Sequence, residues 1–127
     1  MLKQLSAVTD FHTAFAIGHS EIPRADLGDV KNMLRFNLMK EENEEYLEAV
    51  LNKDLTEIAD ALGDMMYILC GTIIEHGLQH KIEEVFDEIQ RSNMSKLGQD
   101  GKPIYREDGK VMKGPNYFRP DFSKILK

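Results

Sequence analysis

A chain of 127 residues with 42% hydrophobic residues has room for one domain with a modest core, so we expect a single domain over residues 1–127. The formal net charge of −6 is unevenly distributed: residues 1–93 hold 8 Lys and Arg against 18 Asp and Glu, and residues 94–127 hold 8 against 4. Residues 1–93 are therefore acidic and would be repelled by duplex DNA and by anionic membranes, so we expect no nucleic-acid or membrane partner.

No run in the sequence approaches the roughly 20 consecutive apolar residues that a membrane-spanning helix needs, and the N-terminal stretch has no continuous apolar segment of the signal-peptide type. The lone cysteine, Cys70, cannot support a disulfide framework and suits a reducing compartment. We therefore expect a cytoplasmic protein.

Two helices are expected in the first half of the chain. A first amphipathic helix ends near Gly18, and its apolar stripe consists of Leu5, Val8, His12 and Phe15. A loop over residues 19–29 follows. The second helix runs roughly from Val30 to Leu51, and residues 52–53 form a short connector.

The third helix carries a recognisable start signal. Asp54 is expected as its N-cap, with Glu57 at the third helical position in the arrangement of a capping box. The helix should end at Gly77. Because the connector before Asp54 is so short, the second and third helices are expected to be antiparallel neighbours.

A fourth helix and an irregular tail complete the chain. The apolar stripe of this helix consists of Ile82, Val85, Phe86 and Ile89, and Asn93, Lys96 and Leu97 continue it. In the tail after Gly98, Asp108-Gly109 predicts a small hairpin that pairs residues 104–105 with residues 111–112. The pattern predicts an all-α fold, a four-helix bundle with a short irregular or hairpin tail.

The second and third helices carry carboxylates where apolar residues are expected. Between Glu41 and Asp64 the chain holds nine Asp and Glu against a single Lys. In the second helix, Glu42 and Glu45 interrupt an apolar stripe that includes Leu34, Leu38 and Ala49. In the third helix one narrow acidic face, formed by Glu57, Asp60 and Asp64, lies on an otherwise apolar helix.

Ionised carboxylates that share an apolar interior repel one another and lose hydration, which costs several kcal/mol per ion unless a positive charge compensates. A divalent cation would supply that charge. Oxygen ligands without convergent Cys or His favour Mg²⁺ or Mn²⁺ over Zn²⁺. The pair His76 and His80 straddles Gly77 and is expected at the surface, away from a metal.

These residues resemble a known signature. The pattern EExxE at Glu41, Glu42 and Glu45, followed by ExxD at Glu57 and Asp60, resembles the all-α nucleotide pyrophosphohydrolases, which comprise MazG-like proteins, dimeric dUTPases and phosphoribosyl-ATP pyrophosphatases. The runs EIADALGDMMYILCGT and RSNMSKLGQDGKPIYREDGKVMKGPNYF are similar to the phosphoribosyl-ATP pyrophosphohydrolase-like members, and the resemblance covers roughly residues 30–120.

The resemblance implies a MazG-like bundle and Mg²⁺-dependent hydrolysis of a nucleoside triphosphate between its α and β phosphates, giving monophosphate and pyrophosphate. By the same resemblance, the Mg²⁺ ligands would be Glu42, Glu45, Glu57 and Asp60, with Asp64, one turn further, as an additional ligand or water holder. Glu41 would be the catalytic carboxylate, which either activates the attacking water or supports the metal ligands from behind, and Asn93 and Lys96 would contact the phosphates.

Structural roles remain open for several of these residues. Glu57 also fits a capping-box partner of Asp54, Asn93 a helix cap, and Lys96 a cation that complements a helix C-terminus. Glu44 and Glu48 are read as solvated helix charges, a role that is also open for Glu41, and a structural role is open for Glu45.

Two other classes of protein use helices of this kind. A carboxylate-bridged di-iron redox protein normally supplies Glu-x-x-His pairs, and none occurs in this sequence. A non-catalytic helical binding or assembly module would leave its acids in solvent. Apolar residues on several helix faces also predict a homodimer or a dimer of dimers. No local motif in the sequence identifies the base or the sugar of the substrate.

Overall fold

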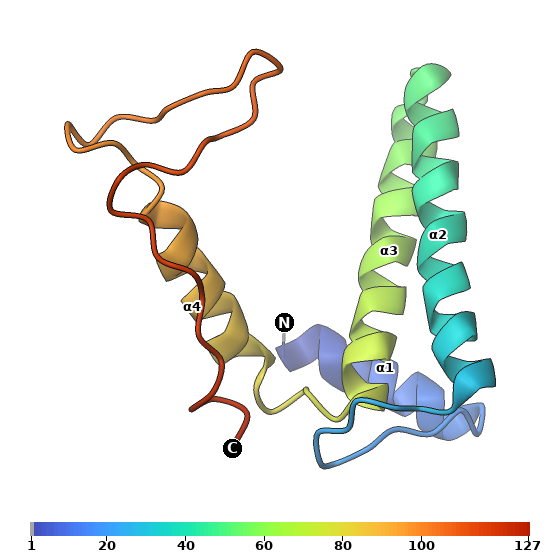
Figure 1. Cartoon of the computed structure of the whole chain (residues 1–127). Coiled ribbons are helices and arrows are strands. Elements are labelled where there is room, and N and C mark those ends of the chain that lie inside the picture. Colours follow the sequence, from blue (N-terminus) through green and yellow to red (C-terminus); the bar gives the residue numbers. More distant parts are fainter. Residues whose placement is uncertain (1) are drawn as a thin grey trace. The chain divides into compact units, whose positions relative to one another are not determined.

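The structure, a computed structural model, describes residues 2–127 and confirms the all-α fold (Figure 1). The helices of these residues are α1 (Leu2–Ala14), α2 (Asp29–Leu51), α3 (Leu55–Glu75) and α4 (Ile82–Met94). None of these four is long and apolar enough to cross a membrane.

The described chain divides into two compact units, with the boundary between His80 and Lys81. The first unit contains α1, α2 and α3, and the second contains α4 and the C-terminal tail. Each unit has its own internal packing. The single domain expected from chain length stays a prediction beside this division.

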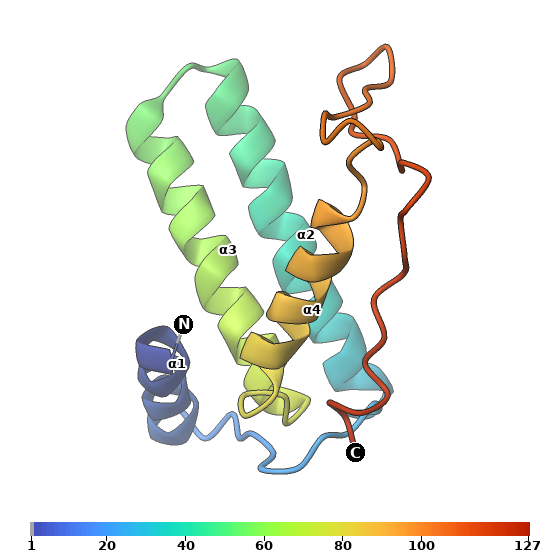
Figure 2. The ribbon, with the colours of Figure 1, turned by 90° about the vertical axis from the view of Figure 1, so that its left-hand side faces the viewer.

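In the first unit, α2 and α3 lie side by side and antiparallel, and the turn between them spans residues 52–54 (Figures 1 and 2). Asn52 N–H donates to Glu48 O, and Lys53 closes the turn with a left-handed φ of 52°. Helix α1 packs against α3. The buried apolar side chains come from all three helices: Leu5, Val8, Ala49, Ala61, Cys70, Ile73 and Ile74. The expected antiparallel pair is confirmed.

Helix α1 ends earlier than the expected boundary near Gly18. The carbonyl of His12 accepts from Ile17 N–H at 2.8 Å, and Ala16 adopts a left-handed φ of 55°. This backbone reversal ends the helix because a left-handed residue cannot continue a right-handed helix.

The end of α3 lies within two residues of the expected boundary at Gly77. This glycine has a φ of 69°, and a Cβ atom built on it would lie 1.9 Å from the carbonyl oxygen of Ile22. Both the backbone conformation and the close approach of the loop therefore require glycine here.

In the second unit, α4 is shorter than expected, because it ends at Met94 and Ser95 is its C-cap. The hydroxyl of Ser95 donates to Ser92 O and accepts from Phe118 N–H, so the tail takes the place of a further helical turn. The expectation that Lys96 continues the helical stripe is therefore wrong.

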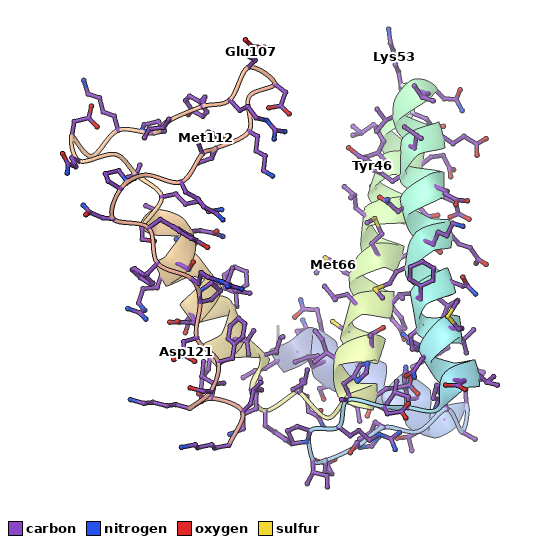
Figure 3. The ribbon with its side chains drawn as sticks, viewed as in Figure 1. Tyr46, Lys53, Met66, Glu107, Met112 and Asp121 are labelled. Carbon is purple, nitrogen blue, oxygen red and sulfur yellow. The ribbon has the colours of Figure 1, made fainter. Side chains whose placement is uncertain are left out.

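The tail folds back along α4 and carries the expected hairpin. Ser92 Oγ donates to Phe118 O at 2.8 Å, and the carboxylate of Glu88 accepts from Asp121 N–H at 2.8 Å. The hairpin is confirmed by an antiparallel bridge between Tyr105 and Val111. Figure 3 shows the side chains of this segment, with Glu107 labelled at its turn and Met112 on its second arm.

Candidate metal centre

Three carboxylates meet where α2 faces α3. Glu42 and Glu45 lie one turn apart on α2, and Asp64 lies on α3. One oxygen from each of the three side chains lies within 4.8 Å of the other two. This spacing brings three negative charges into a volume that a single cation can span.

Glu42 has the most perturbed environment of the three. Burial raises the pKa of its carboxyl from 4.5 to about 7, with further contributions from a hydrogen bond to Glu45 and from the negative charges of Glu45, Asp64 and Asp60. Its Oε2 atom is buried and has no hydrogen-bond partner among the described residues. A buried carboxylate oxygen without a partner is costly, and a cation would satisfy it.

An open cleft of about 510 Å³ lies at the turn end of α2 and α3. It is lined by Glu45, Glu48, Ala49, Asn52, Asp54, Glu57, Asp60 and Ala61. Glu45 belongs both to this cleft and to the group with Glu42 and Asp64. The structure therefore places the five predicted metal ligands around one continuous acidic region.

The N-cap of α3 leaves the Glu57 side chain available. Asp54 Oδ1 accepts from Glu57 N–H at 3.2 Å, which confirms the predicted N-cap. The reciprocal half of a capping box is replaced, because Asp54 N–H donates to Ala49 O at 3.1 Å. The carboxylate of Glu57 is therefore not needed for capping and can face the cleft.

The other predicted site residues lie elsewhere. Glu41 is exposed on α2 and belongs neither to the three-carboxylate group nor to the lining of the cleft. Asn93 is exposed in the last turn of α4, and the half-buried Lys96 follows the helix, where its carbonyl accepts from Gly114 N–H. Both belong to the second unit. Their approach to the acidic residues of the first unit stays a prediction.

Two lining residues had no role in the sequence interpretation. Glu48 was expected to be a solvated charge, and Asn52 was expected only as part of a connector. The spacing of Glu48, one turn after Glu45, was the available signal. Asn52 gave none, because its place in the cleft depends on how the turn folds.

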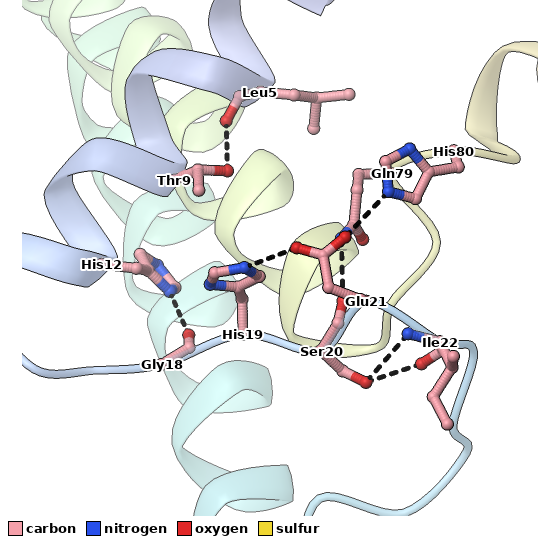
Figure 4. Close-up of polar contacts among 10 residues, drawn as sticks. All are labelled: Leu5, Thr9, His12, Gly18, His19, Ser20, Glu21, Ile22, Gln79 and His80. Carbon is pink, nitrogen blue, oxygen red and sulfur yellow. Dashed lines mark hydrogen bonds and ion pairs between the residues drawn. The ribbon is translucent and has the colours of Figure 1, made fainter.

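Three histidines, His19, His76 and His80, make polar contacts away from the acidic group. Nε2 of His19 and Nε2 of His80 contact the two oxygens of Glu21 at 2.9 Å and 3.0 Å (Figure 4). Nδ1 of His76 contacts Arg24 O at 2.9 Å. These contacts fasten the loop between α1 and α2 to the end of α3.

The residues present fit a hard divalent cation. All the donors are carboxylate oxygens, and one of them, Glu42 Oε2, is buried without a partner among the described residues. Such a donor set suits Mg²⁺ or Mn²⁺.

An antiparallel helical pair with carboxylates facing across it, in an all-α chain, is the arrangement expected from the resemblance to the MazG-like pyrophosphohydrolases. Comparison with known proteins agrees. The sequence pattern of the phosphoribosyl-ATP pyrophosphohydrolase family matches residues 8–93, and the chain belongs to that family. The protein is thus a pyrophosphohydrolase.

One solved structure with a similar chain is a candidate NTP pyrophosphohydrolase from Exiguobacterium sp. 255-15. The two sequences are 26% identical, the match covers 92% of this chain and 88% of that one, and the TM-score is 0.46. No curated protein matches the chain.

Proposed function

We propose that the protein hydrolyses a nucleoside triphosphate, or a related nucleotide, between the α and β phosphates, giving a monophosphate and pyrophosphate. The family supports the pyrophosphohydrolase reaction. The observation that carries the proposal further is the group of Glu42, Glu45 and Asp64, whose oxygens approach within 4.8 Å of one another beside an open cleft.

The proposed cofactor is Mg²⁺, with Mn²⁺ as a substitute. Its ligands would come from Glu42, Glu45, Glu57, Asp60 and Asp64. When bound, the ion would neutralise charge on the phosphate oxygens, which acidic side chains cannot do by direct contact.

Other side chains of the protein would hold the attacking water and bind the phosphate groups. Glu41 would hold the attacking water and accept its proton. Asn93 would donate to a phosphate oxygen from its amide, and Lys96 would neutralise a phosphate with its ammonium group. The cleft of about 510 Å³ is within the usual size range of small-molecule sites.

A panel of nucleotides tests the reaction. The protein is incubated with Mg²⁺ and each of dUTP, dCTP, oxidised nucleotides and phosphoribosyl-ATP, and pyrophosphate release is measured. We expect a triphosphate analogue with a non-hydrolysable α–β bridge to resist cleavage and one with a non-hydrolysable β–γ bridge to be cleaved. Cleavage of the β–γ bond, or binding of nucleotides without turnover, would contradict the proposal.

We also propose that the protein acts in the cytoplasm as a homodimer or a dimer of dimers. Large apolar side chains are exposed in the structure, including Leu51 at 73% and Leu55 at 78%. Exposed apolar surface on this scale is typical of an interaction surface. Light scattering on the purified protein would give the oligomeric state, and a monomer at micromolar concentration would contradict it.

A further inference from the structure

A buried ion pair joins α2 to α3 on one side of the acidic group. Glu75 is fully buried at 0% exposure, and its two oxygens lie 2.6 Å from Lys31 Nζ and 3.4 Å from Arg35 Nε. Arg35 is itself 6% exposed. A buried charge of this kind tolerates few arrangements of the two helices, because any other leaves it unpaired.

The Arg35 side chain occupies a defined slot on α3. Nη2 of Arg35 donates to Ile68 O at 2.9 Å, and its Nε donates to Thr72 Oγ1 at 3.1 Å. A Cβ atom on Gly71 would lie 2.6 Å from Arg35 Nη2, so a side chain at that position would displace the guanidinium group from where it now lies. These directional bonds specify both the rotation and the translation of α2 against α3.

The same register brings the carboxylates together. Arg35 and Glu42 share the face of α2 that meets α3, about two helical turns apart, and Asp64 and Glu75 share a face of α3, about three turns apart. Sliding one helix by a residue would move Glu42 away from Asp64 and also unpair Glu75.

On the other side of the acidic group, the bonded turn fixes where α3 begins, but the apolar contacts between the helices define the rotation of α3 less sharply. Ala49 and Ala61 are buried at 4% and 2% exposure at the turn end of the pair. Small apolar side chains allow close approach, but apolar contact is not directional. Repulsion of Asp64 on α3 by Glu42 and Glu45 on α2 meanwhile pushes the helices apart between the two contacts.

We propose that Arg35 and Glu75 are positioning residues that set the register of α2 against α3 and so hold Glu42 opposite Asp64 for the metal ion. The inference rests on the proposed function, because it assigns these residues a task at the proposed metal centre. Neither residue belongs to the three-carboxylate group or lines the cleft.

The test separates register from stability. In the double variant Arg35→Met/Glu75→Leu the ion pair is replaced by apolar side chains, an exchange that often leaves stability unchanged. Lys31, whose side chain is 32% exposed, can turn its ammonium group into water. We expect a near wild-type midpoint of urea unfolding together with Mn²⁺ binding about 10-fold weaker, measured by electron paramagnetic resonance.

Val8→Ala is the matched control, because Val8 is buried on α1 at 2% exposure. It should lower the unfolding midpoint and leave Mn²⁺ affinity unchanged. If it weakens Mn²⁺ binding as much as the double variant does, loss of stability explains the effect and the inference is wrong.

Two further outcomes are decisive. Wild-type Mn²⁺ affinity in the double variant would overturn the inference while leaving the proposed function intact. No Mn²⁺ binding by the wild-type protein would overturn the proposed metal centre itself. Should the double variant not fold, Arg35→Lys, which keeps the charge and loses the planar fork, is read in the same way: weaker binding supports the inference and unchanged binding overturns it.

Discussion

Glu42 is the side chain of the proposed metal centre whose ionisation is most strongly opposed by its surroundings. Its carboxyl combines partial burial, a hydrogen bond to Glu45 and the negative charges of Asp64 and Asp60, all of which oppose ionisation. The remaining oxygen has no partner among the residues described here. At the scale of single residues, the metal-free site is therefore strained by charge, and neutralisation should relieve it.

The first prediction concerns Glu42→Gln without metal. The pKa of Glu42 is about 7 in the folded state against an ordinary 4.5, so between these pH values the folded state holds a proton that the unfolded state has lost. The contribution of the Glu42 carboxyl to the free energy of unfolding is therefore fully present below pH 4.5 and is lost as pH rises through about 7. Gln does not titrate, so the variant should gain melting temperature relative to wild type as pH increases across that window.

Calorimetry at several pH values in a chelator measures this difference. With saturating Mg²⁺ the order should reverse, because the amide is a poorer ligand than the carboxylate. A melting-temperature difference between the variant and the wild type that stays constant with pH would contradict the raised pKa of Glu42.

The second prediction concerns Glu45→Gln and Asp60→Asn. Each exchange removes one proposed ligand and one repelling charge, so the fold should persist or become slightly more stable without metal. Turnover should fall by about 100-fold or more, the scale observed when one group that stabilises a transition state is removed. Glu44→Gln, an exposed residue of the same helix, is the matched control and should keep full pyrophosphate release. Normal turnover in both site variants would place the site elsewhere.

The third prediction concerns Lys96→Ala. If the Lys96 ammonium contacts a phosphate beyond the metal, triphosphate affinity should fall about tenfold, and affinity for the monophosphate should change less. Lys124→Ala, an exposed lysine of the same unit, should change neither. Titration calorimetry with product and with a non-hydrolysable triphosphate measures both affinities. Equal weakening would place Lys96 at the α-phosphate or the sugar, and no weakening would remove it from the site.

At the scale of secondary structure, the turn between α2 and α3 aligns the two acidic faces. Its backbone is held by the Asp54 cap, the left-handed Lys53 and the bond from Asp54 N–H to Ala49 O. The turn is short and well bonded, so α3 starts at a defined point beside α2. The cleft begins at this same turn.

The fourth prediction concerns the cap. Asp54→Ala should lower the free energy of unfolding by about 1 kcal/mol, because Glu57 N–H loses its acceptor. Asp54→Asn keeps an acceptor oxygen and should retain most of the stability. Urea unfolding of both variants provides the measurement. A loss as large in Asn as in Ala would show that the charge of Asp54, and not its capping bond, stabilises the helix.

At the scale of the whole molecule, the body is acidic and the tail is basic. The acidic part of the chain should gain stability from a bound cation, because carboxylates of the first unit repel one another in the folded state. The fifth prediction is that millimolar Mg²⁺ or Mn²⁺ raises the melting temperature, because an ion that binds only the folded state stabilises it by mass action. At a concentration 100 times the dissociation constant, the gain in the free energy of unfolding is about 2.7 kcal/mol.

Scanning calorimetry with and without Mg²⁺ checks this, and potassium chloride at matched ionic strength controls for screening. The increase should shrink in Asp60→Asn. Equal increases with potassium chloride and with Mg²⁺ would indicate general screening and no specific site.

Local features of the chain were predictable from its sequence, because they depend on neighbours within one or two helical turns. Helix α2 was expected to begin at Val30 and begins at Asp29, and the Asp54 cap and the hairpin around Gly109 were placed correctly. The acidic faces also followed from periodicity alone, since helical geometry puts residues three or four apart on one side.

Tertiary structure decided which of these acids meet. Asp64, an additional candidate in the sequence, lies in the tight group with Glu42 and Glu45, whereas Glu57 and Asp60 line the adjoining cleft. It also decided that α4 ends at Met94, because the tail bonds to its last turn. Contacts between helices depend on their relative register, and that register arises from packing and paired charges between residues far apart in the chain, which no local pattern encodes.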